Sequence, residues 1–188
     1  RDRSPSRGLG DVYKRQSLLS ADQSDLYAET MQLGLEERGY GFWAVELRSA
    51  KGTQGPFIGC VGLSVPQWNA AFTPCMDIGW RLSRDYWGMG YASEAARRIL
   101  DYSFNQLDLD ELLCFASVKN LRSIAVMERL GMVRNAEDDF DHPMIDPDSD
   151  LRRHALYRMS RQRWLSSRRR RRWLRSAAFP TEFFHRQS

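Results

Sequence analysis

Two glycines separated by a single residue, Gly88 and Gly90, restrict the fold of this chain more than any other feature of its sequence. They lie in the run RDYWGMGYASE, between a strand-like segment and a helix-like segment that begins near Tyr91. Because glycine has no Cβ, the backbone N–H groups of this turn stay accessible, and the helix directs its N-terminal donors and positive dipole end at the same place. The turn therefore predicts a site for a phosphorylated ligand, with a purely structural strand-to-helix turn as the alternative.

The spacing of the glycines excludes two common phosphate-binding motifs. The dinucleotide motif G-x-G-x-x-G needs a third glycine where Ser93 stands, and a P-loop needs a lysine where Tyr91 stands. The turn instead resembles the pyrophosphate loop of the GNAT acetyltransferases, Q/R-x-x-G-x-G/A followed by a helix. Asp85 departs from this pattern at the Gln/Arg position, whereas residues 87–95 (WGMGYASEA) resemble the RimJ/RimL-type branch of that family.

A second segment, residues 118–132, resembles another signature of the same family, N-x-x-S-x-x-x-x-x-x-L-G-[FM]. Asn120, Ser123 and Gly131 occupy fixed positions of this signature. The preceding residues read as an apolar strand, and Asn120 or its neighbour starts a helix that Gly131 stops. Two loops that open helices after adjacent parallel strands explain both segments better than two unrelated helix caps. The resemblance covers about residues 18–164.

The hydrophobic pattern predicts an α/β fold. The resemblance implies the GNAT fold, with a mixed central sheet of an antiparallel meander and a splayed parallel pair, flanked by helices. It also implies that the N-terminal strand and helix of the family are missing, which would expose apolar residues around Leu26, Met31 and Leu35. We expect helices over 22–38, 91–107 and 121–130, and strands over 42–48, 57–65, 75–82, 111–118, from about 132, and 154–159.

Composition favours one soluble domain in a reducing cytoplasm. The chain has 188 residues, of which 42% are hydrophobic, and contains no apolar run long enough to span a membrane. No cysteine or histidine pattern has metal-ligand spacing, so we expect buried free thiols and no metal cofactor. These residues are Cys60, Cys75, Cys114, His142, His154 and His185.

Charge and composition divide the chain into three parts. Residues 1–16 are basic and aperiodic and resemble a lead-in of non-native origin. Residues 17–164 form the expected domain, and residues 165–188 form an Arg-rich tail that we expect to be disordered or weakly helical. The body is acidic, with seven carboxylates and no Lys or Arg over 137–150. This segment is either a solvated loop or a field that attracts a cationic amine.

The resemblance implies acetyl-CoA as cosubstrate and assigns its contacts residue by residue. Asn120 would bind the cofactor arm, and Ser123 would protonate the departing thiolate, unless it serves only as a first-turn helix residue. Trp87 and Tyr91 are equally consistent with core positions. Main-chain groups of Gly79, Trp80, Arg81 and Leu82 would face the thioester, and Arg84, Trp87, Gly88, Met89, Gly90, Tyr91 and Ala92 would hold the pyrophosphate.

The sequence does not identify which residue acts as the general base that removes the amine proton. Candidates are Glu46 on an early strand and four residues of the acidic segment, and a chain of water molecules could replace them. Neither motif contains a cysteine, which favours direct transfer in a ternary complex over an acetyl-cysteine intermediate. The four residues are Asp138, Asp139, Asp141 and His142.

These observations predict an acetyl-CoA-dependent N-acetyltransferase that acts on a primary amine of a protein or small molecule, as a monomer or homodimer. One rival is a protein that binds nucleic acid nonspecifically through the Arg tail, with Trp164 and Trp173 as stacking groups. Every basic cluster lies outside the acidic body, which argues against this rival. Another is a truncated CoA-binding fragment without activity.

Overall fold

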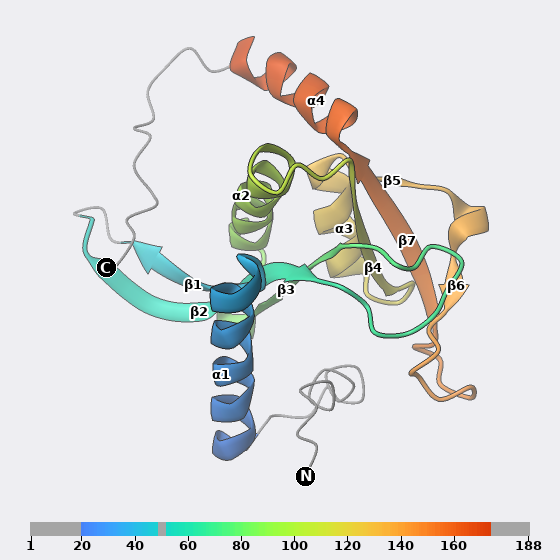
Figure 1. The fold of residues 1–188 in the computed structure, drawn as a ribbon, viewed down its shortest axis with the longest axis horizontal. Helices are drawn as coiled ribbons and strands as arrows, with labels where there is room; N and C mark the ends of the chain where they lie inside the picture. Colours follow the sequence, from blue (N-terminus) through green and yellow to red (C-terminus); the bar gives the residue numbers. More distant parts are fainter. Residues whose placement is uncertain (1–19, 49–51, 174–188) are drawn as a thin grey trace.

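A computed structural model describes residues 20–48 and 52–173. Its centre is one seven-stranded sheet, in the order β1-β2-β3-β4-β7-β5, with β6 paired to β7 (Figure 1). The strands are β1 (Phe42–Arg48), β2 (Gln54–Ser64), β3 (Asp77–Leu82), β4 (Glu111–Ser117), β5 (Val133–Arg134), β6 (Phe140–Asp141) and β7 (Arg153–Ser160).

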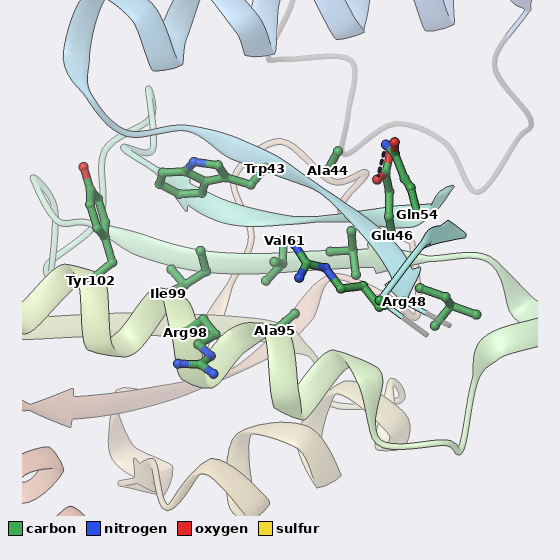
Figure 2. Close-up of a pocket in the computed structure, with 13 residues that line it drawn as sticks. Trp43, Ala44, Glu46, Arg48, Gln54, Val61, Ala95, Arg98, Ile99 and Tyr102 are labelled. Carbon is green, nitrogen blue, oxygen red and sulfur yellow. Dashed lines mark hydrogen bonds between the residues drawn. The ribbon is translucent and has the colours of Figure 1, made fainter. Parts of the chain in front are cut away.

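Four α-helices are described around this sheet, together with two short 3-10 helices. They are α1 (Ala21–Arg38), α2 (Tyr91–Asn105), α3 (Leu121–Leu130), α4 (Arg161–Trp173), η2 (Arg84–Tyr86) and η3 (Ala136–Asp138). Figure 2 shows α1 and α2 on opposite sides of the first strands. The expected mixed sheet flanked by helices is therefore confirmed.

The pairing of the strands explains the mixed sheet. Strands β1, β2 and β3 form an antiparallel meander, β3 and β4 run parallel, and β4 and β7 run antiparallel. The parallel connection requires a crossover, which α2 provides.

Helices α2 and α3 contact each other and cover one face of the sheet. Ile99 and Leu100 of α2 and Met127 of α3 point into a core that continues through Leu112 and Cys114 of β4. Because the apolar positions of both helices recur at three- and four-residue spacing, each presents one continuous buried stripe to the sheet.

The ends of α2 and α3 follow local backbone chemistry. Gly90 precedes α2 with a positive φ of 89° and no side-chain cap. Asn120 caps α3 by accepting a hydrogen bond from the backbone N–H of Ser123 at 3.1 Å, and Gly131 ends α3 with φ at 86°. The left-handed backbone at both glycines is one that residues with a Cβ rarely adopt.

Four expectations need correction. Strand β3 begins at Asp77 rather than 75. Strand β2 begins at Gln54 rather than 57, because Gln54 pairs with Arg48 beyond a register shift in β1. Helix α2 ends at Asn105 rather than 107. Strand β5 covers only Val133–Arg134, because the chain turns into η3 directly afterwards.

The start of the C-terminal segment is helical, which is one of the two expected outcomes, but its expected boundary does not coincide with the end of an element. Helix α4 runs to Trp173, so the boundary proposed after Trp164 falls inside a helix. Trp164 is only 3% exposed, and its indole Nε1 donates to Asp101 of α2 at 3.0 Å. The guanidinium of Arg168 pairs with the same carboxylate at 2.7 Å, which anchors the start of the Arg-rich segment on the domain. The proposed lead-in and residues 174–188 lie outside the described residues.

The exposed apolar residues expected on α1 are present in part. Leu26 is 63% exposed, whereas Met31 and Leu35 are half-buried. All three cysteines are free thiols, as predicted, but only Cys60 and Cys114 are buried, whereas Cys75 is half-buried. Across the described ranges, no helix is both long and apolar enough to cross a membrane.

Candidate active site

The central feature of the candidate site is a gap between β3 and β4. Strand β3 pairs with β2 along its full length, but its register with β4 consists of one pair, Asp77 with Leu113. Because two parallel strands that share one pair cannot continue a ladder, β3 and β4 diverge beyond this point. The splay expected from the sequence is therefore present.

The hydrogen-bond alternation of the meander shows which backbone groups face the gap. The N–H of Ser83 donates to Ile58 of β2 at 2.8 Å. Polar groups of alternate residues in an antiparallel strand point to opposite sides, so Arg81 and Gly79 also face β2. The N–H groups of Trp80 and Leu82 face the gap instead. Only these two of the four predicted main-chain donors are placed to contact a ligand there.

Strand β4 supplies the opposite wall. The N–H of Val118 donates to Arg153 of β7 at 2.9 Å, so the even-numbered residues of β4 pair with β7. The backbone N–H and C=O of Phe115 consequently face the gap. An extended ligand arm between the strands would meet unpaired main-chain groups on both sides.

The glycine turn follows directly from the gap-lining end of β3. Gly88 and Gly90 have φ values of 80° and 89°, and a Cβ added at either would meet nothing within 4 Å. The first N–H to bond back along α2 is that of Glu94, which donates to Gly90. The N–H groups of the three preceding residues stay outside the helical ladder and remain available to an anion.

Trp87 is 41% exposed and therefore not a core residue, which removes one of its two expected roles. Its indole Nε1 donates to the carbonyl oxygen of Leu82 at 2.8 Å. Two guanidinium groups lie over its ring, with Cζ at 5.6 Å for Arg84 and 4.8 Å for Arg122. Tyr91 is half-buried. Arg122 comes from α3 and was not identified as a site residue from the sequence.

Asn120 and Ser123 lie at the start of α3, as expected. The side-chain oxygen of Asn120 is used to cap the helix, which leaves its amide nitrogen as the group that can donate to a ligand. Ser123 is half-buried, and within the described residues its hydroxyl makes no hydrogen bond. The helix-capping alternative therefore accounts for Asn120 in part and for the hydroxyl of Ser123 not at all.

The acidic candidates mostly have basic partners. Asp139 forms an ion pair with Arg134, and the hydrogen bond from that guanidinium lowers the pKa of the carboxyl. Asp138 pairs with Arg158 at 3.3 Å. Asp141 pairs with Arg153 at 3.4 Å and Arg152 at 3.9 Å. The acidic segment is therefore partly neutralised by β5 and β7 rather than presenting an open negative field.

Glu46 and His142 occupy two further environments. Glu46 borders a pocket of about 580 Å³ between β1, β2 and α2, where it accepts a hydrogen bond from Gln54 at 2.7 Å. Both side chains point away from α2 in Figure 2.

His142 is fully buried against Trp68, with ring centroids 4.7 Å apart, and burial lowers its pKa to about 4. Neither Glu46 nor His142 belongs to the two strands that border the gap.

Asp77 is a site candidate that sequence reasoning missed. It sits at the vertex of the splay, is 6% exposed, and accepts a hydrogen bond from the hydroxyl of Ser64 at 2.8 Å. Burial raises its pKa to about 7, against the opposing effect of hydrogen bonds from Ser64 and its own backbone. A lone acidic residue inside the apolar run CMDIGW was the available signal.

The arrangement of the gap and the glycine turn fits acetyl-CoA. A gap with unpaired main-chain groups suits an extended pantetheine arm, and the glycine turn suits the phosphates joined to it. In the described part of the chain, no three His, Cys, Asp or Glu side chains are grouped to hold a metal ion.

Comparisons with known proteins agree with this geometry. Residues 11–133 match the family model described as an acetyltransferase (GNAT) domain. The chain is 40% identical over 98 residues to the uncharacterized protein YkkB of Bacillus subtilis, covering 51% of this chain and 54% of that protein. It is 33% identical over 89 residues to the FsC-acetyl coenzyme A-N(2)-transacetylase of Aspergillus fumigatus, covering 47% and 37%. The chain thus spans about a third to a half of the length of these relatives.

Solved structures share the fold. A mutant form of the spermidine N-acetyltransferase SpeG from Vibrio cholerae superimposes with a TM-score of 0.58 at 16% identity, covering 86% of this chain and 93% of that one. An acetyltransferase from Agrobacterium tumefaciens gives a TM-score of 0.54 at 23% identity, covering 78% and 75%. From the family match over residues 11–133, together with this fold, the chain belongs to the GNAT acetyltransferase family.

Proposed function

We propose that the protein transfers the acetyl group of acetyl-CoA directly to a primary amine, as a RimJ/RimL-like member of its family in the cytoplasm. The observation that carries this proposal is the gap between β3 and β4, which opens at Asp77 and leads to the glycine turn at Gly88 and Gly90. The cofactor arm would lie in the gap, and its pyrophosphate would accept hydrogen bonds from the N–H groups at the start of α2.

The reaction needs four groups with distinct tasks. The amine nitrogen attacks the thioester carbonyl, and the carbonyl oxygen becomes an oxyanion. The N–H groups of Trp80 and Leu82 face this position from the edge of β3 and would stabilise the negative charge. Collapse of the intermediate breaks the carbon–sulfur bond. The hydroxyl of Ser123 would then protonate the departing CoA thiolate.

The remaining task is removal of the amine proton, and Asp77 fits it better than the bases expected from the sequence. A general base works best with a pKa near the operating pH. The carboxyl of Asp77 has a pKa of about 7, whereas the pKa of Asp139 is held low by Arg134. Asp141 carries two arginine partners, and Glu46 lies on β1. Asp77 alone of this group belongs to a strand that borders the gap.

The acceptor is proposed only as a class, a primary amine on a protein or small molecule. The relative from Aspergillus fumigatus is named an acetyl coenzyme A-N(2)-transacetylase, and the SpeG neighbour is named a spermidine N-acetyltransferase. The paired state of the acidic segment weakens the idea that it selects a highly charged amine. The uncharged form of the amine is the nucleophile in either case.

Release of free CoA thiol across a panel of primary amines tests the proposal. We expect amine-dependent release, and a drop of about 10²-fold or more in kcat for Asp77→Asn, the size typical of a lost general base. Loss of the Asp77 carboxyl should remove the rise in kcat/KM near pH 7. Asp139→Asn serves as the matched control and should keep the pH profile. Nucleic-acid binding through α4 without thiol release would favour the rival function.

A further inference from the structure

The two arginines at Trp87 come from different parts of the fold. Arg84 lies in η2, directly after β3, and Arg122 lies in the first turn of α3, directly after β4. Their guanidinium groups nevertheless approach one indole ring, at 5.6 Å and 4.8 Å from its centroid. The loops that follow the two splayed strands therefore meet at Trp87, beside the glycine turn.

Trp87 is a fixed platform for these cations. Its ring is held by the hydrogen bond from Nε1 to Leu82, so it cannot swing away without losing that bond. A guanidinium over an indole face is attracted by the ring quadrupole.

The two arginines have no anionic partner within the described residues. Neither forms an ion pair with a carboxylate there. By contrast, most arginines of β7 and α4 whose side chains are described do form such a pair. Two like charges on one ring repel each other, and an anion between them would remove that repulsion. Within the turn itself, the charge of Asp85 offsets that of Arg84. Arg122 adds a further positive charge to this corner from α3.

We propose that Arg122 binds a phosphate group of the CoA cosubstrate, and that α3 thereby supplies the positive charge that the glycine turn lacks. The proposal rests on the proposed function, because the phosphate belongs to the cofactor. Arg122 lies at the end of the gap that is next to the glycine turn. The phosphates of a CoA molecule bound in the gap would emerge from between the strands at this end. Its fork of donors suits a phosphate oxygen pair, and charge-assisted bonds of this type are roughly twice as strong as neutral ones.

Calorimetric titration of Arg122→Gln with three probes tests the proposal: CoA, 3′-dephospho-CoA and pantetheine, which has no phosphate. We expect the Kd for CoA to rise about tenfold or more, with pantetheine binding unchanged. A rise for CoA but not for 3′-dephospho-CoA would assign Arg122 to the 3′-phosphate, and an equal rise for both would assign it to the pyrophosphate. The slope of affinity against salt should also be smaller in the variant.

Arg98→Gln is the matched control, because it removes one exposed positive charge on α2, in the pocket beside β1. It should leave the Kd for CoA unchanged. Arg122→Lys keeps the charge but not the planar fork and should give an intermediate Kd. An unchanged Kd for CoA in Arg122→Gln, or an equal loss of pantetheine binding, would overturn the inference. Failure of the wild-type protein to bind CoA would instead overturn the proposed function.

Discussion

The indole nitrogen of Trp87 donates a hydrogen bond to the carbonyl oxygen of Leu82, with 2.8 Å between the two atoms. This bond joins the glycine turn to the end of β3 that borders the gap. It also agrees with the alternation of the strand, in which the polar groups of Leu82 point away from β2. The glycine turn and the main-chain donors of the gap are thus coupled through one side chain.

Replacing Trp87 by Phe should weaken cofactor binding with little effect on stability. Phe keeps a ring for the arginines but cannot donate to Leu82, and the residue is 41% exposed. We expect a several-fold higher Kd for acetyl-CoA and a free energy of unfolding within about 1 kcal/mol of the wild type, the size of one hydrogen bond. Calorimetry and denaturant unfolding measure the two quantities. A large loss of stability with normal binding would show that Trp87 is structural.

Replacing Gly90 by Val should block CoA binding, because a β-branched side chain would fill the space where a pyrophosphate approaches the backbone. Gly131→Val is a close control. Both glycines have left-handed φ values, 89° and 86°, and neither has an atom within 4 Å of an added Cβ. Both variants should therefore lose similar stability, about 1–2 kcal/mol from backbone strain. Only Gly90→Val should lose CoA affinity, and equal affinities in the two variants would refute the phosphate site.

Asp77 should make the protein less stable as pH rises. Its pKa is about 7 in the folded state against 3.8 ordinarily, so the folded protein keeps a proton that the unfolded chain releases between pH 4 and 7. Relative to wild type, Asp77→Asn should gain on the order of 4 kcal/mol in unfolding free energy between pH 4 and pH 8. Denaturant unfolding at several pH values measures this gain. A pH-independent difference would mean that the carboxyl is charged throughout.

The pair His142 and His154 should make the protein less stable as pH falls, which is opposite to the effect of Asp77. Their rings are 5.0 Å apart in an aromatic cluster, and burial lowers the pKa of both, for His142 to about 4. The unfolded chain therefore binds protons first as pH falls from about 6.5 to 4, which favours unfolding. His142→Phe should lose less stability than wild type over this window, by about 3 kcal/mol. Parallel pH dependences of the two proteins would contradict this assignment.

Regular periodic segments were predictable from the sequence, and β1 and α3 have the predicted bounds. The acidic segment was not predictable in detail. Strands β5 and β6 have two residues each, and η3 between them is held by ion pairs such as that between Asp138 and Arg158, twenty positions apart. Such short elements have no period of their own and depend on contacts that only the folded chain creates.

The site was predictable where it depends on local backbone chemistry, and less so where it depends on strand direction. The glycine turn and the splay are present as expected. Which main-chain groups of Gly79, Trp80, Arg81 and Leu82 face the gap follows from register alone. The position of Arg122 at Trp87 joins residues far apart in sequence. The burial that raises the pKa of Asp77 likewise arises only in the packed fold.

Mass spectrometry of primary amines incubated with the protein and acetyl-CoA that carries a labelled acetyl group tests the proposed acetyl transfer most directly. We expect an amine product heavier by one labelled acetyl group, formed by the wild-type protein and by Gly131→Val but not by Gly90→Val. Absence of a labelled amine, together with wild-type protein that does not bind acetyl-CoA, would contradict the assignment of the gap and the glycine turn as an acetyl-transfer site.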